Sequence, residues 1–183
     1  MRLTLIALLL AGVVGCDPTP EEKFEATLKA AERGNAGAQY ELGGMYYYGQ
    51  GVPEDYTESA KWYRKAAEQG HAEAQFHLGL MYRLGYGVPE DYAEAAKWCR
   101  KAAEQGYARA QWMLGGIYVD GEGVPEDDIE GYAWFSVAAT SGYAGTDKLL
   151  LRAIKADLTP EQLTAAEKRA AELLKQINAK KAK

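Results

Sequence analysis

A five-residue segment, Gly-Val-Pro-Glu-Asp, occurs three times in this chain at a constant spacing. Its copies begin at Gly51, Gly87 and Gly123, so each starts 36 residues after the one before it. The similarity extends beyond the segment, because residues 51–86 and 87–122 match at roughly two-thirds of their positions. A fixed period of about 20 to 50 residues is the signature of an array of repeats that stack on one another. The period therefore predicts a solenoid of three similar units.

Each period predicts two helices. Apolar residues recur at helical spacing within 72–84 and again within 91–105. In the first segment they are Ala74, Leu78, Met81 and Tyr82, and in the second they are Ala95, Trp98, Cys99 and Ala102. The chain is thus expected to be helical throughout its repeats.

The repeated segment joins these two helices. Gly85 and Gly87 can adopt positive φ where the first helix ends, and Pro89 cannot continue that helix. Asp91 is a favourable N-cap for the second helix, with Glu94 three residues later as in a capping box. A phosphate-binding loop would follow a strand and end in Lys-Ser or Lys-Thr, whereas here a helix precedes and an acidic pair follows. These glycines are interpreted as joints between helices.

The full pattern is A-x-A-Q-x-x-L-G-x-x-Y-x-x-G-x-G-V-P-x-D-x-x-x-A-x-x-W-x-x-x-A-A-x-x-G, which is similar to the Sel-one-like repeat, a relative of the tetratricopeptide repeat with a longer loop. Three copies carry it, at 36–70, 72–106 and 108–142. The resemblance implies an all-α protein, a right-handed α-α superhelix with terminal capping helices. It also implies binding of other proteins, often in bacterial envelopes or in signalling.

The ends of the array resemble each other. Residues 19–22 and 159–162 both read Thr-Pro-Glu followed by Glu or Gln, which predicts an N-cap with proline in the first turn. The second of these opens a helix with one apolar stripe, formed by Leu163, Ala166, Ala170, Leu173 and Ile177. We expect a solenoid over 21–178 with roughly nine helices, in which 144–178 forms a degenerate repeat and a capping helix.

The amino terminus resembles a bacterial lipoprotein signal. Met1-Arg2 is followed by a short apolar run to Val14 and then by Gly15-Cys16, which fits a signal peptide better than a transmembrane helix. We expect removal of 1–15, lipidation of Cys16 and a short tether at 16–20; an ordinary secretory signal and an uncleaved anchor are the alternatives. This implies a lipid anchor in the bacterial envelope, facing the periplasm in a Gram-negative cell. Asp17 implies inner-membrane retention where the enterobacterial sorting rule applies.

Composition argues against nucleic-acid binding and against catalysis. The net charge is −5, whereas phosphate-backbone binding requires clustered Lys and Arg. His71 and His77 are the only histidines, and no Cys or carboxylate set accompanies them at metal-ligand spacing. Cys99 aligns with Tyr63 and Phe135, so we expect a buried thiol without reactivity. The sequence predicts no enzyme, no metal and no cofactor.

Comparison of the repeats with one another indicates a binding face. Positions such as Trp62, Trp98 and Trp134 are invariant and are expected to pack, whereas other positions of the first helices vary on one helical face. By resemblance to tetratricopeptide stacks, this face lines a concave groove. The expected partner-binding residues are Tyr40, Tyr47, Glu73, Phe76, Leu80, Arg83, Arg109, Trp112 and Val119. Alternatively, Tyr40, Phe76 and Trp112 only complete packing between repeats.

These observations predict a membrane-anchored adaptor that binds a protein segment in its groove, since aromatic and Arg residues are typical interface anchors. The alternative is a binder of envelope polysaccharide or peptidoglycan, or an accessory subunit of an enzyme acting on that polymer, because aromatic walls also suit sugars.

Overall fold

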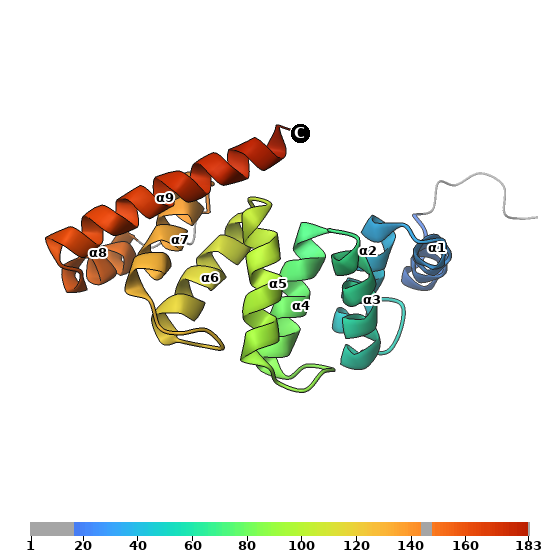
Figure 1. Ribbon diagram of the computed structural model, residues 1–183. Coiled ribbons are helices and arrows are strands. Elements are labelled where there is room, and N and C mark those ends of the chain that lie inside the picture. The colour runs from blue at the N-terminus through green and yellow to red at the C-terminus, as the bar shows by residue number, and fades with distance from the viewer. Residues whose placement is uncertain (1–16, 144–147, 183) are drawn as a thin grey trace, which may run out of the picture.

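The computed structural model describes residues 17–143 and 148–182. These residues form nine helices and contain no strand: α1 Pro20–Glu32, α2 Ala36–Tyr48, α3 Tyr56–Glu68, α4 Ala72–Leu84, α5 Tyr92–Glu104, α6 Ala108–Asp120, α7 Asp128–Thr140, α8 Lys148–Asp157 and α9 Pro160–Lys181. Figure 1 shows one continuous stack from α1 to α7, in which each helix packs on the next one in sequence, whereas α8 and α9 both pack against α7. The expected all-α solenoid is confirmed. The signal peptide expected at 1–15, Cys16, residues 144–147 and Lys183 lie outside the described residues.

The two helices of each repeat approach closely because the first helix carries a glycine at the contact. A Cβ added at Gly79 of α4 would lie 2.6 Å from the Cys99 Sγ of α5, which is too short for any real contact. Cys99 is fully buried there, and burial raises the pKa of its thiol to about 12, as the expectation of an unreactive thiol requires. The equivalent pairs are Gly43 with Tyr63 and Gly115 with Phe135.

The joints between helices also hold neighbouring repeats together. Gly85 ends α4 with a φ of 67°, and Gly87 follows with a φ of 66°. A Cβ on Gly87 would lie 2.0 Å from the carbonyl oxygen of Tyr56, at the start of α3 in the preceding repeat. The second glycine of each joint therefore contacts the backbone of the preceding helix, and any side chain at this position would push the two apart. Equivalent contacts join Gly51 to Pro20 and Gly123 to Tyr92.

The capping prediction at the joints is only half right. The Asp91 side chain accepts a hydrogen bond from the Glu94 backbone N–H at 2.9 Å. The Glu94 carboxylate does not return to Asp91; it accepts from the Trp98 indole at 3.1 Å and from Lys97 at 2.7 Å. A buried indole N–H needs a partner, and Glu94 supplies it. The full reciprocal capping box occurs at Thr19 and Thr159, as predicted.

Each first helix has a buried glutamine near its start, and in the first two repeats this residue links three helices. The Gln75 Nε2 donates to the Ala67 carbonyl at 3.0 Å, and its Oε1 accepts from the Gln105 side chain at 2.7 Å. The first repeat makes the same bonds through Gln39. In the third repeat Ser141 replaces the donor, and the Oε1 of Gln111 has no partner among the described residues. This linkage therefore ends where the regular repeats end.

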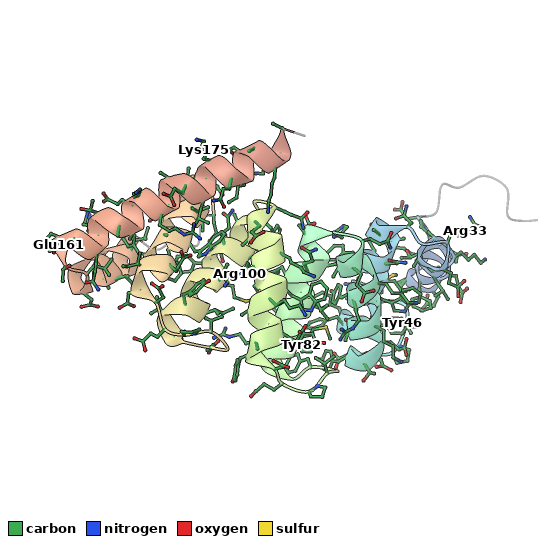
Figure 2. The ribbon with its side chains drawn as sticks, viewed as in Figure 1. Arg33, Tyr46, Tyr82, Arg100, Glu161 and Lys175 are labelled. Carbon is green, nitrogen blue, oxygen red and sulfur yellow. The ribbon has the colours of Figure 1, made fainter. Side chains whose placement is uncertain are left out.

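Helix α9 closes the stack by lying along α7 and reaching α5 (Figure 1). Four of the five stripe residues are buried and Leu163 is half-buried, which confirms the stripe. Figure 2 shows Glu161 and Lys175 exposed on α9. The basic end is anchored by Lys180, whose Nζ lies 2.8 Å from a Glu104 carboxylate oxygen.

The position of α9 explains why the third repeat departs from the other two. At the positions of Lys97 and Lys101, α7 carries Ala133 and Val137, and both are fully buried. The loss of these lysines lets α9 pack without burying a charge, which would be costly.

Within the described residues, no helix has the length and apolar character needed to cross a bilayer.

Candidate binding groove

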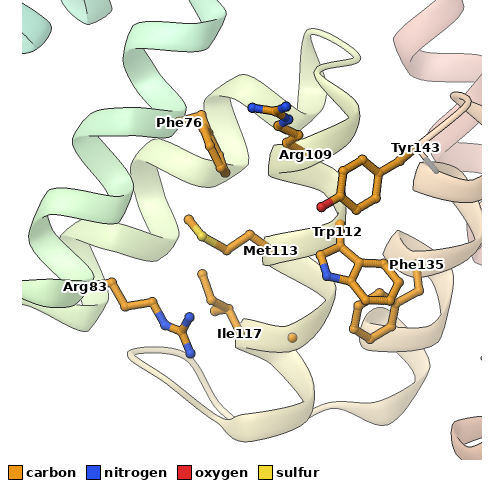
Figure 3. Close-up of a pocket in the computed structure, with 9 residues that line it drawn as sticks. Phe76, Arg83, Arg109, Trp112, Met113, Ile117, Phe135 and Tyr143 are labelled. Atoms are coloured by element: carbon orange, nitrogen blue, oxygen red, sulfur yellow. The ribbon is translucent and has the colours of Figure 1, made fainter. Parts of the chain in front are cut away.

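The first helices α2, α4 and α6 line a surface with two hollows, which we call the groove. The larger hollow, of about 310 Å³, lies beside α6 and contains four expected residues: Phe76, Arg83, Arg109 and Trp112. Figure 3 shows Trp112 and its aromatic neighbours on one side, with Phe76 and Arg83 across from them. Residues of α4 and α6, which belong to different repeats, thus line one hollow.

An aromatic group forms one wall of this hollow. The Trp112 ring centroid lies 4.4 Å from that of Phe135 and 5.8 Å from that of Tyr143. The chain has four tryptophans, and all four are described; Trp112 is half-buried, whereas the other three are buried. Trp112 is therefore the tryptophan that a groove ligand would contact.

A glycine keeps the hollow open. Apart from its chain neighbours and the backbone of its own helix, no atom lies within 4 Å of a Cβ built on Gly116. The equivalent residue of the second repeat is Leu80, and that of the first is Gly44, which adjoins the second hollow, of about 260 Å³. Along the three repeats, this position of the groove is therefore open in the first, filled by a side chain in the second and open in the third. Sequence comparison placed this position among the varying ones but proposed only Leu80 as a partner-binding residue.

The second hollow has a different lining. Tyr40 and Tyr63 adjoin it, together with His77, whose pKa is lowered chiefly by burial. His77 is consequently neutral at pH 7. Lys23 and Glu41 contribute one charge of each sign, so this hollow favours neither anions nor cations.

Arg83 has a partner inside the stack. Its Nε and Nη2 atoms donate to the two carboxylate oxygens of Glu122 at 2.7 and 3.0 Å. In the preceding repeat the same two positions hold Tyr47 and Tyr86, whose ring centroids lie 6.5 Å apart. The last turn of a first helix thus contacts a residue in the joint of the following repeat, and the two residues change as a pair from one repeat to the next. Part of the divergence that we attributed to a partner has this internal cause.

Packing between repeats also involves the aromatic residues at the Trp112 position. Tyr40 stacks on His71 with centroids 4.8 Å apart, and Phe76 lies 5.4 Å from Tyr107. Phe76 is 8% exposed, so it mainly packs, whereas Tyr40 and Trp112 are half-buried and also face the hollows. All three residues therefore pack between repeats, and Tyr40 and Trp112 also have surface on the hollows; that they bind a partner stays a prediction.

The remaining expected residues are placed differently. Arg109 is exposed at the rim of the larger hollow, and no carboxylate among the described residues pairs with it. Glu73 is half-buried beside His71, whose Nδ1 caps α4. Val119 packs in the hydrophobic cluster around Phe135 and does not line the hollow, and Tyr47 contacts Tyr56. Sequence reasoning did not propose Met113, Phe135, Gly116 or Tyr143 as partner-binding residues, although all four line the hollow.

Stacked helix pairs, backbone-to-backbone joints and a groove along the first helices define an α-solenoid of the tetratricopeptide kind. The Sel1 repeat family matches residues 36–71, 72–107 and 108–143. The chain belongs to this family.

Two solved structures share the fold. One is the crystal structure of c5321, described as a protective antigen present in uropathogenic Escherichia coli strains displaying an SLR fold; it is 36% identical with a TM-score of 0.82. The other is a Sel1 repeat protein from Oxalobacter formigenes, 34% identical with a TM-score of 0.73. The matches cover 91% and 87% of this chain but only 36% and 65% of those chains. No curated protein matches this chain.

Metal-ligand clusters are absent from the described part of the chain. No group of three or more His, Cys, Asp or Glu residues there could hold a metal ion. What the groove offers is apolar contact area and positive charge.

Proposed function

We propose that this protein is a membrane-anchored adaptor of the bacterial envelope that binds a segment of another protein along its groove. The observation that carries the proposal is the open hollow at Gly116, where aromatic walls adjoin Arg109, a cation with no ion-pair partner among the described residues. Aromatic and Arg residues dominate the binding energy of protein interfaces. Each repeat presents a different residue to the groove, which suits recognition of an extended segment.

The anchor in this proposal is a lipid on Cys16. Helix α1 begins at Pro20, so only Asp17, Pro18 and Thr19 separate it from Cys16. Three extended residues span roughly 10 Å, which would hold α1 next to the bilayer. One acyl chain binds membranes only marginally, and two or more make attachment stable.

The anchor is tested by Cys16→Ser in the full-length chain. We expect the variant to be shed from the membrane fraction or to accumulate with its first 15 residues attached. Unchanged fractionation together with unchanged processing contradicts the lipid anchor. Localisation between inner and outer membrane fractions then tests whether Asp17 acts as a retention signal.

The groove is tested by placing a photo-crosslinking amino acid at Arg109 and, as a matched control, at Lys97. Both positions are exposed, but Lys97 lies on α5, a second helix. We expect irradiated cells to yield a defined protein adduct from position 109 and none from position 97. Adducts from position 97 alone would place the binding surface elsewhere.

The glycan alternative rests on the same aromatic wall, because Trp112 and Tyr143 could stack on sugar rings. It is tested by sedimenting the chain from Asp17 onward, which contains every described helix, with purified peptidoglycan. Retention on the polymer that Trp112→Ala abolishes, with no protein adduct from position 109, would favour the glycan.

A further inference from the structure

We propose that the hollow at Gly116 is a side-chain pocket that accepts one bulky apolar residue of the partner segment and pairs an adjacent acidic residue with Arg109. The inference rests on the proposed function, because it takes the occupant to be a peptide. It adds the chemistry that the peptide must carry at one position.

The size of the hollow sets the apolar part of the occupant. Its volume of about 310 Å³ lies at the small end of the range for ligand pockets, so it suits one large side chain better than an extended ligand. Trp112, Phe135 and Met113 provide its apolar surface. The molecule itself indicates what fits, because the second repeat fills the equivalent position with Leu80.

The charge at the rim sets the polar part. Two arginines adjoin the hollow, but Arg83 is neutralised by its two hydrogen bonds to Glu122. Arg109 has no ion-pair partner among the described residues. Its side chain hydrogen-bonds the Tyr107 hydroxyl, which carries no charge, so its positive charge stays available to a ligand at this rim. A guanidinium binds a carboxylate through two parallel hydrogen bonds. An acidic residue next to the apolar one would meet this group.

The sign of the charge distinguishes the two hollows. The hollow beside Gly44 has Lys23 and Glu41 at its edge, so its charges cancel. Only the Gly116 hollow should therefore select an acidic neighbour. This asymmetry also gives the partner segment a direction along the groove.

The test uses two peptides and the indole resonance of Trp112. The probes are acetyl-Gly-Ser-Phe-Asp-Gly-Ser-amide and the same peptide with lysine in place of aspartate. Each is titrated into the chain from Asp17 onward, labelled with ¹⁵N in its tryptophan indoles, with the Trp112 signal assigned by Trp112→Phe. We expect a saturable shift of the Trp112 signal, with the aspartate peptide binding at least about threefold more tightly, because reversing a charge beside an exposed arginine has an effect of this size.

Two glycine substitutions provide matched variants. Gly116→Leu gives the third repeat the side chain of the second, and we expect it to weaken binding of the aspartate peptide at least about tenfold. Gly44→Leu fills the other hollow, where a Cβ meets only the Tyr63 hydroxyl at 3.6 Å, and we expect it to leave the Trp112 shift unchanged. If Gly116→Leu proves unfolded by circular dichroism, Gly116→Ala takes its place, with an expected weakening of at least about threefold. Arg109→Gln should equalise the affinities of the two peptides.

Several outcomes would overturn the pocket. They are a Trp112 shift that persists unchanged in the Gly116 variant, equal affinity for both peptides in the unsubstituted protein, and no saturable shift at about 10 mM peptide. In each case a protein adduct from position 109 would leave the adaptor function standing. Conversely, selective peptide binding without any such adduct would support the pocket and contradict the adaptor.

Discussion

Gly115 and Gly116 are neighbours in α6, yet alanine at these two positions should change stability in opposite directions. A Cβ on Gly115 would lie 2.8 Å from the Phe135 ring, whereas nothing lies within 4 Å of a Cβ on Gly116. Phe135 cannot move aside easily, since it is buried and its ring packs against Trp112. The helix and its propensity are the same for both substitutions, so the difference isolates packing.

The magnitudes follow from two opposing effects. Replacing glycine by alanine inside a helix stabilises it by about 0.8–1.0 kcal/mol. At Gly116 only this gain applies, so we expect a melting temperature about 2–4 °C higher for a chain of this size. At Gly115 the overpacking against Phe135 costs about 1–3 kcal/mol. The net effect there is a loss of about 1 kcal/mol and a melting temperature lower by a similar number of degrees.

Thermal unfolding followed by circular dichroism at 222 nm measures both variants, and urea unfolding gives the free energies. The reasoning would be refuted if both substitutions moved the melting temperature in the same direction. Such a result would mean that Phe135 yields to the added methyl group, or that Gly116 is less open than its surroundings indicate.

Three other predictions concern stability and reactivity. Trp98→Ala should reduce the free energy of unfolding by about 3–5 kcal/mol through the cavity it leaves, whereas Gln50→Ala, in an exposed joint, should stay within about 0.5 kcal/mol; equal losses in urea unfolding would contradict the packing assignment. A double-mutant cycle between Arg83→Ala and Glu122→Ala should give a coupling of about 0.5–1 kcal/mol that shrinks at high salt, because the pair is partly exposed; strict additivity would show that the pair contributes nothing. Cys99 should not react with a thiol reagent at pH 8 until the protein unfolds. Folding raises the pKa of this thiol to about 12. The stability that the thiol contributes is therefore complete below its ordinary pKa of about 8.5 and declines as the pH rises above it. The free energy of unfolding should then fall less between pH 8 and 9.5 in Cys99→Ala than in the unsubstituted protein, and an equal fall would contradict this.

Much of the fold could be predicted because the same signals for helices, joints and caps occur in each of the three repeats. The glycines and Asp91 of the joints, the two capping boxes and the apolar stripe of α9 all appear at their predicted places. The path of α9 could not be predicted, because an apolar stripe shows that a helix is covered but not by what. A signal existed in Ala133 and Val137, which replace the lysines of the preceding repeat where α9 lies.

The candidate site could be predicted only in part, since pairings between residues far apart in sequence are invisible to a comparison of single positions. Phe76, Arg109 and Trp112 were found from their variation and do line the hollow. Arg83 was interpreted as a partner contact, but its ion pair with Glu122 could not be foreseen because the two residues are 39 positions apart in the sequence. Gly116 was passed over because an open space has no side chain to indicate it.

The covering of α7 by α9 determines where this array could lengthen by duplication. A new 36-residue unit inserted before α4 would bring its own joint, and it would find the same glycine contacts on both sides. A unit copied from the second repeat and inserted after α7 would instead place residues equivalent to Lys97 and Lys101 beneath α9, where Ala133 and Val137 now pack. The array can therefore gain repeats on the α1 side, whereas the packing of α9 on α7 prevents insertion of a copied repeat on the α9 side. Successive duplications would carry the Gly116 hollow farther from the amino terminus while its immediate surroundings stayed the same.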